Sequence, residues 1–117
     1  MALLNQLFSK DRLTGLKRAS VSVTTAGAGN GTLVAAVASK IIRVYGVVLS
    51  SSAAVNIKFQ SGTGGTDLTG PLSLAANGGF SAAFVPVGHF QTAEGVLLNL
   101  NLDAAATVGG WLIYAEI

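Results

Sequence analysis

From residue 19 onward the chain consists of short runs rich in Val, Ile, Thr and Phe, interrupted by Gly, Asn and Ser. Runs of this kind, bounded by turn-forming residues at intervals of roughly 8–12 positions, are typical of β-strands. The pattern predicts about eight strands, near residues 19–25, 32–38, 40–50, 54–60, 70–74, 79–85, 95–103 and 109–116. The segments between them supply the Gly and Asn residues that tight reversals with positive φ require.

Two of these strands alternate strictly between apolar and polar residues, which predicts one buried and one wet face for each. The apolar positions are Val55, Ile57 and Phe59 in one strand and Val96, Leu98, Leu100 and Leu102 in the other. The polar positions are Asn56, Lys58, Gln60, Asn99, Asn101 and Asp103. Both strands are therefore expected in a sheet that turns one face to the core.

The strands at 40–50 and 109–116 are apolar on both faces. A strand of this kind lies either between two layers or beneath a neighbouring subunit. In a chain of 117 residues we expect contacts with a neighbouring subunit. The candidate interface residues in or near these strands are Ile41, Tyr45, Val47, Phe90, Leu112 and Tyr114.

About eight antiparallel strands in a chain of this length close most economically as a two-sheet sandwich, either a jelly roll or an immunoglobulin-like fold. The chain has no cysteine, which excludes the disulfide framework of antibody domains and also thiolate metal sites. We predict an all-β protein with a single antiparallel β-sandwich domain, jelly-roll-like, at residues 19–117. An N-terminal arm or short helix at residues 1–18 is expected to precede it.

The N-terminal arm carries apolar residues at helix-like spacing, and its candidate interface residues are Leu3, Leu4, Leu7 and Phe8. A helix this short is marginal unless another surface receives its apolar face. Four basic residues and Asp11 give residues 1–18 a net charge of +3, whereas the remaining residues sum to −1. Because no aromatic-stacking pattern accompanies this charge, we expect contact with solvent or protein and no nucleic-acid binding.

Charged residues make up only 10% of the chain and hydrophobic residues 50%, against a usual charged share of about 25%. This composition predicts that another protein covers part of the surface. The uncharged runs at 19–39 and 68–93 contain many small polar residues and are not apolar helices, so we expect no membrane span. The N-terminal charges follow the apolar residues, unlike those of a secretory signal, so we expect a soluble protein made and used without secretion.

Residues suited to reaction chemistry are sparse. His89 is the only histidine and has Glu94 five positions later, but a lone histidine without a positioned partner is not a catalytic motif. One histidine and five scattered carboxylates give no metal-ligand spacing. The Gly-rich stretch at 62–67 has Asp67 where a dinucleotide fingerprint needs glycine, and no P-loop lysine follows it. We therefore predict no enzyme activity and no catalytic, cofactor-binding or metal site.

The stretch SLAANGGFSAAFVPVGHFQTAEGVLLNLNL at 73–102 and the ending VGGWLIYAEI resemble a type of small bacteriophage virion protein. These are Gly- and Ala-rich β-sandwich subunits that decorate or cement phage heads, and the resemblance covers roughly residues 19–117. It implies a non-enzymatic capsid decoration protein on the virion exterior, assembled in the host cytoplasm. Its expected partners are the major capsid protein and further copies of itself in a homotrimer, with no cofactor and no small-molecule substrate.

Two other functions remain open from the sequence. A tail or fibre module that binds a receptor or glycan would need exposed aromatic side chains in a groove. The candidates are Tyr45, Phe80, Phe84, Phe90, Trp111 and Tyr114, all expected in the core because they lie in apolar strands. A hydrolase on a sandwich scaffold would depend on His89.

Overall fold

The structure of the protein is a computed structural model that describes residues 15–117, and these residues form strands and no helix. The strands are β1 (Leu16–Thr25), β2 (Gly29–Val34), β3 (Ile42–Ser51), β4 (Val55–Ser61), β5 (Thr66–Asp67), β6 (Leu72–Leu74), β7 (Gly79–Ala82), β8 (Phe90–Gln91), β9 (Leu98–Leu102) and β10 (Ala106–Glu116). Because they contain no helix, the described residues include none long and apolar enough to span a membrane.

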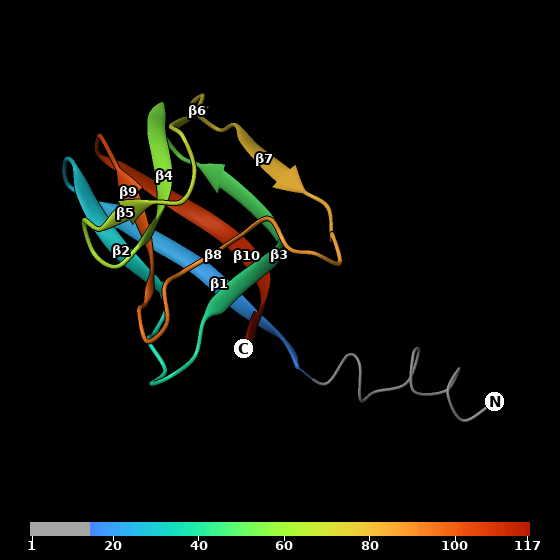
Figure 1. Cartoon of the computed structure of the whole chain (residues 1–117). Helices are drawn as coiled ribbons and strands as arrows, with labels where there is room; N and C mark the ends of the chain where they lie inside the picture. The colour runs from blue at the N-terminus through green and yellow to red at the C-terminus, as the bar shows by residue number, and fades with distance from the viewer. Residues whose placement is uncertain (1–14) are drawn as a thin grey trace.

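The strands form two antiparallel sheets, which Figure 1 shows as two layers. The first, called here the β1 sheet, has the order β1-β10-β3-β7, with β8 also paired to β3. The second, the β2 sheet, has the order β2-β9-β4-β5, with β6 also paired to β4. The prediction of an all-β chain with antiparallel sheets is confirmed, in a β-sandwich-like arrangement.

Apart from β10·β3 and β9·β4, which complete the two sheets, the strand pairs join the beginning of the described chain to its end. β1 pairs with β10, β2 with β9, β3 with β7 and β8, and β4 with β5 and β6. The described chain is therefore one long hairpin, closed around β4 and β5, whose successive pairs fall alternately in the two sheets. This pairing brings residues from opposite ends of the chain together, as in the pair Leu16 and Ala115.

Each of the eight predicted ranges overlaps one strand, but β5 and β8 were not predicted. A strand of two residues has no measurable alternation and is detected only by its pairing. β1 begins at Leu16, so Lys17 and Arg18, assigned from the sequence to the N-terminal arm, belong to the sheet. The candidate interface residues of the arm lie outside the described residues; they are Leu3, Leu4, Leu7 and Phe8.

The core lies between the inward faces of the two sheets. Its large, fully buried apolar side chains are Ile42, Val44, Leu49, Ile57, Phe59, Leu98, Leu100, Leu102, Val108 and Leu112. The ring of Phe90 on β8 packs on that of Phe59, with centroids 4.8 Å apart, and so joins the sheets. Burying each large side chain contributes about 1.5–3 kcal/mol, so this layer is the main stabilising element.

Candidate functional site

The outer face of the β1 sheet carries exposed apolar residues. Val47 and Leu112 are paired between β3 and β10 and are buried in the core. The next pair in register, Val48 and Trp111, therefore points outward, because side chains alternate along a strand. Trp111 keeps 45% of its surface exposed, and Val48 is half-buried. Val48 and Trp111, called here the apolar strip, lie side by side in the middle of the sheet. Ser20 of β1 and Ser81 of β7 lie next to them in register.

A β-bulge shapes one side of this strip. Ile113 pairs with Gly46 and Tyr114 with Val44, which leaves Tyr45 as the extra residue of β3. Tyr45 is buried, yet it is not part of the core between the sheets. The ring of Phe84 stacks on it instead, with centroids 5.7 Å apart.

The segment that supplies Phe84 is the connection between β7 and β8, residues 83–89, called here the β7–β8 loop. Figure 1 shows it projecting from the sheet on the right of the molecule. Its middle reads Phe-Val-Pro-Val, residues 84–87, with 48% of Phe84 and 78% of Val87 exposed. Exposed runs of apolar residues such as this one are unusual on a protein surface unless another molecule covers them.

Hydrogen bonds from β3 hold this loop in place. The carbonyl oxygen of Tyr45 accepts from the amide of Val85 at 3.0 Å, and that of Val44 accepts from the amide of His89 at 2.7 Å. The amide of Gly88, which has a φ of 82°, donates to the carbonyl oxygen of Val85 at 2.9 Å and closes the turn. The loop is thus fixed to the sheet along its length.

His89 also closes the loop through its side chain. Its Nε2 lies 2.8 Å from the carbonyl oxygen of Ala83, and because a carbonyl only accepts, Nε2 carries the donated proton. The imidazole therefore ties the last residue of the loop to its first. The side chain serves as a structural tie at this position, and its partner is backbone rather than a nucleophile or a carboxylate.

At the other edge of the same face, β1 and the end of β10 form a shallow, open depression. It is lined by Leu16, Lys17, Arg18 and Ile113. Lys17 Nζ lies 2.8 Å from Glu116 Oε1, and this hydrogen bond, with the attraction of the carboxylate, raises the pKa of Lys17. Arg18 has no ion-pair partner within residues 15–117, so its guanidinium is the uncompensated charge of the depression.

The outer face of the β2 sheet is polar instead. Gln60 and Asn99, predicted to face water, are 5% and 0% exposed. Asn99 Nδ2 donates to Gln60 Oε1 and to Asn30 Oδ1, both at 2.9 Å, and Gln60 Nε2 donates to Asp67 Oδ1 at 2.9 Å. The side-chain amides of neighbouring strands shield one another from water through these hydrogen bonds. The expectation of a wet face was therefore wrong at Gln60 and Asn99.

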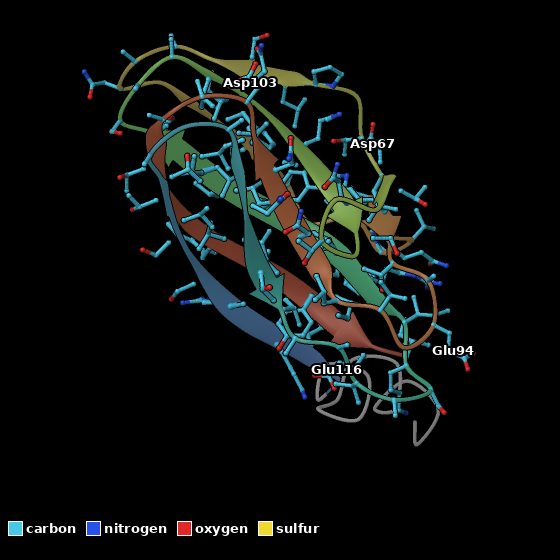
Figure 2. The ribbon with its side chains drawn as sticks, turned by 90° about the vertical axis from the view of Figure 1, so that its left-hand side faces the viewer. Asp67, Glu94, Asp103 and Glu116 are labelled. Atoms are coloured by element: carbon cyan, nitrogen blue, oxygen red, sulfur yellow. The ribbon has the colours of Figure 1, made fainter. Side chains whose placement is uncertain are left out.

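Carboxylates of this polar face are held by hydrogen bonds. The bond from Gln60, followed by that from Lys58, lowers the pKa of Asp67. Figure 2 shows Asp67 and Asp103 in the upper half of the view and Glu94 and Glu116 in the lower half. Within residues 15–117, no three His, Cys, Asp or Glu side chains come together as metal ligands.

The candidate interface residues of β3, β8 and β10 lie mostly inside the chain itself. Val47 and Leu112 point into the core, and Tyr45 is covered by Phe84. Phe90 and Tyr114 are half-buried and pack against the core. Ile41 is half-buried and exchanges two backbone hydrogen bonds of 2.8 Å with Ile117. Val47 and Leu112 have the inward parity of their strands, and their outward neighbours Val48 and Trp111 are more exposed. A role of the six residues in an interface stays a prediction.

The expectation that all aromatic residues lie in the core was wrong for Trp111 and Phe84, because 45% and 48% of their surfaces are exposed. The signal in the sequence was the Phe-Val-Pro-Val run, in which Pro86 lacks the amide that a strand needs. No known family model, curated protein or solved structure matches the chain. The surfaces of the molecule are therefore the basis for assigning its function.

Proposed function

We propose that the protein is a non-enzymatic structural subunit of a bacteriophage virion, of the capsid decoration or cement type. It binds the major capsid protein on the outside of the head, in the form of a homotrimer assembled in the host cytoplasm. The observation that carries the proposal is the exposed apolar strip of the β1 sheet with the β7–β8 loop beside it. Exposed patches of this kind in a charge-poor protein mark surfaces that other proteins cover.

The strand pairing supports a jelly-roll assignment of the sandwich. A jelly roll is a long antiparallel hairpin rolled so that its successive strand pairs alternate between two sheets, and it contains two Greek keys. The pairs β1·β10, β2·β9, β3·β7/β8 and β4·β5/β6 follow this rule. Jelly rolls occur in viral capsid proteins and in lectins, so this assignment agrees with the proposal and does not by itself select it.

The distribution of polar groups supports binding rather than catalysis. His89, the only histidine, is engaged by a backbone carbonyl oxygen. The carboxylates of Asp67 and Asp103 accept hydrogen bonds from side-chain amides of the same face. The main feature left for a partner is apolar surface, which supports attachment to protein.

The proposal is tested by measuring how much of this protein purified virions contain. Particles are isolated by density gradient from the culture that produces the protein, and its copy number is measured by quantitative mass spectrometry against the shell protein. A decoration subunit is expected at a copy number comparable to that of the shell protein. A copy number far below that of the shell protein would place it in a tail or fibre, and absence from the particles would exclude a virion role.

Partial exposure of Trp111 favours a second candidate, a receptor- or glycan-binding module of a tail or fibre. Indole rings on a sheet surface stack on sugar faces, and Trp111 lies between Ser20 and Val48 in register. A glycan array is the direct measurement, with Trp111→Ala as the variant and Val48→Ala as the matched control. Saturable binding lost only in Trp111→Ala would favour this function over capsid decoration.

A further inference from the structure

We propose that the β7–β8 loop of one copy packs on the depression at the β1 edge of a second copy. This inference rests on the proposed function, in which the subunit is a homo-oligomer, and it names the contact that builds the oligomer. The depression, lined by Leu16, Lys17, Arg18 and Ile113, is called here the β1 corner.

The loop is already in a fixed conformation before it meets a partner. The amides of Val85 and His89 bond to β3, and the His89 imidazole bonds to the carbonyl oxygen of Ala83. A segment held in this way loses little conformational entropy on binding, so most of the contact energy remains available for association. Its tip residue Val87, with 78% of its surface exposed, has no packing role within the described chain.

The loop and the β1 corner match chemically. The corner offers the apolar side chains of Leu16 and Ile113, and the aliphatic stems of Lys17 and Arg18 extend that apolar area. The apolar side chains of Phe84 and Val87 can be buried there. The loop carries no charged residue, so it brings no group that the two basic residues would repel.

Polar groups on the two surfaces also match. The loop carbonyl oxygens of Phe84, Pro86 and Val87 accept no hydrogen bond within residues 15–117. The Arg18 guanidinium has five N–H donors and no ion-pair partner in the same part of the chain. Contact between the two surfaces would pair donors with acceptors and keep both from being buried unsatisfied.

The loop of the same copy does not fill this contact. It is bonded to β3, on the far side of β10 from β1, and its Phe84 stacks on Tyr45 of β3. The loop and the β1 corner are different patches of one molecule, so a contact between them is heterologous. Heterologous contacts generate a closed ring when the rotation from each copy to the next returns to the first copy. A ring of three copies is the trimer of the proposed function.

Two charge substitutions and their mixture test the contact. Val87→Lys damages the loop, because its ammonium group would face Arg18, and leaves the β1 corner intact. Ile113→Lys damages the corner and leaves the loop intact. The mass in solution is measured by light scattering after size exclusion. The unmodified protein is expected at a multiple of its 11.8 kDa chain mass, and each variant alone as a monomer. An equimolar mixture is expected to regain a species of twice the chain mass, because one intact contact then joins the two variants.

Controls separate a lost contact from a lost fold. Ser22→Lys places the same charge on an exposed position of β1 remote from the corner, and its mass is expected to match that of the unmodified protein. Leu16→Lys is a second variant of the corner, for the case that Ile113→Lys fails to fold. The urea midpoint of each variant is measured to check that the sandwich remains folded.

Several outcomes would overturn the inference. These are a monomeric unmodified protein, an oligomer that survives Val87→Lys, or a mixture that stays monomeric. A monomer whose binding to virion heads is lost in Val87→Lys would show that the loop meets the shell instead, which leaves the proposed function standing. If the protein is an oligomer and the variants behave as expected, but the protein is absent from virions, the contact is supported and the virion role is refuted.

Discussion

At the scale of single residues, two adjacent glycines in β10 have different roles. Gly110 has a φ of 145°, and a Cβ atom there would overlap the carbonyl oxygen of Val48 on the neighbouring strand. Gly109 has an ordinary φ, and a Cβ atom there would lie 3.7 Å from its nearest neighbour, the carbonyl oxygen of Val21. Only Gly110 is thus required by the close approach of β10 to β3.

We expect Gly110→Ala to lower the free energy of unfolding by about 3 kcal/mol, because it adds backbone strain and a clash with a strand that cannot withdraw. Gly109→Ala is the matched control, and its effect is expected within about 1 kcal/mol of zero. Urea denaturation of both variants measures the difference. Equal effects of the two substitutions would contradict the role assigned to Gly110.

At the scale of elements, Asp103 joins the end of β9 to the start of β4. Its Oδ1 accepts from the amide of Asn56 and its Oδ2 from Asn56 Nδ2, both at 2.8 Å. Asn56 Oδ1 in turn accepts from the Ser73 hydroxyl of β6 at 2.7 Å. The backbone bond from Asn56, followed by the side-chain bond, lowers the pKa of Asp103. The Asp103 carboxylate therefore links the end of β9 to β4, and Asn56 continues this link to β6.

This contact predicts acid sensitivity. Because the pKa of Asp103 is lowered on folding, its contribution is present above the ordinary value of 3.8 and is lost as pH falls through the folded pKa. Asp103→Asn is expected to be less stable than the unmodified protein at pH 7, and the difference should shrink below pH 3.8. Urea midpoints across this range give the measurement.

Glu94→Gln is the control for the Asp103 experiment, because no hydrogen bond to the Glu94 carboxylate occurs within residues 15–117. Its stability should follow that of the unmodified protein at every pH. The remaining acid dependence of Asp103→Asn is expected from Asp67, whose pKa is also lowered. A constant difference between Asp103→Asn and the unmodified protein from pH 7 to pH 3 would contradict the assignment.

At the scale of the whole molecule, the folded chain depends on contacts between its ends. Leu16 pairs with Ala115, and Thr25 with Ala106, so β1 cannot form its sheet until almost the whole chain is present. Closing such long loops costs conformational entropy before any contact offsets it. Proteins dominated by non-local strand pairs therefore fold slowly for their size.

We expect the protein to refold on a timescale of about milliseconds to seconds. The fluorescence of Trp111, the only tryptophan, provides the signal in a stopped-flow experiment after dilution from urea. Refolding within microseconds would mean that local contacts dominate, contrary to the pairing of β1 with β10. Measurement with Val87→Lys at the same concentration separates folding of the chain from assembly of the oligomer.

Most of the secondary structure of this protein could be predicted from the order of its amino acids. The alternation of Val55, Ile57 and Phe59 with polar residues identified β4 and its buried face, because a strand repeats every two residues. Turn residues between the apolar runs marked the ends of the strands. The lack of cysteine predicted stabilisation by packing and strand pairing. The low charge content predicted that another protein covers part of the surface, which stays a prediction.

The outward sides of β3 and β10, in contrast, could be assigned only from the folded chain. Both sides of these strands are apolar, so alternation carries no information there, and packing of Leu112 against the other sheet leaves Trp111 outside. Burial of Asn99 likewise depends on amides from neighbouring strands that are far apart in sequence. Strand order and these exposures arise from contacts between distant segments, whereas a sequence pattern reports only on neighbours along the chain.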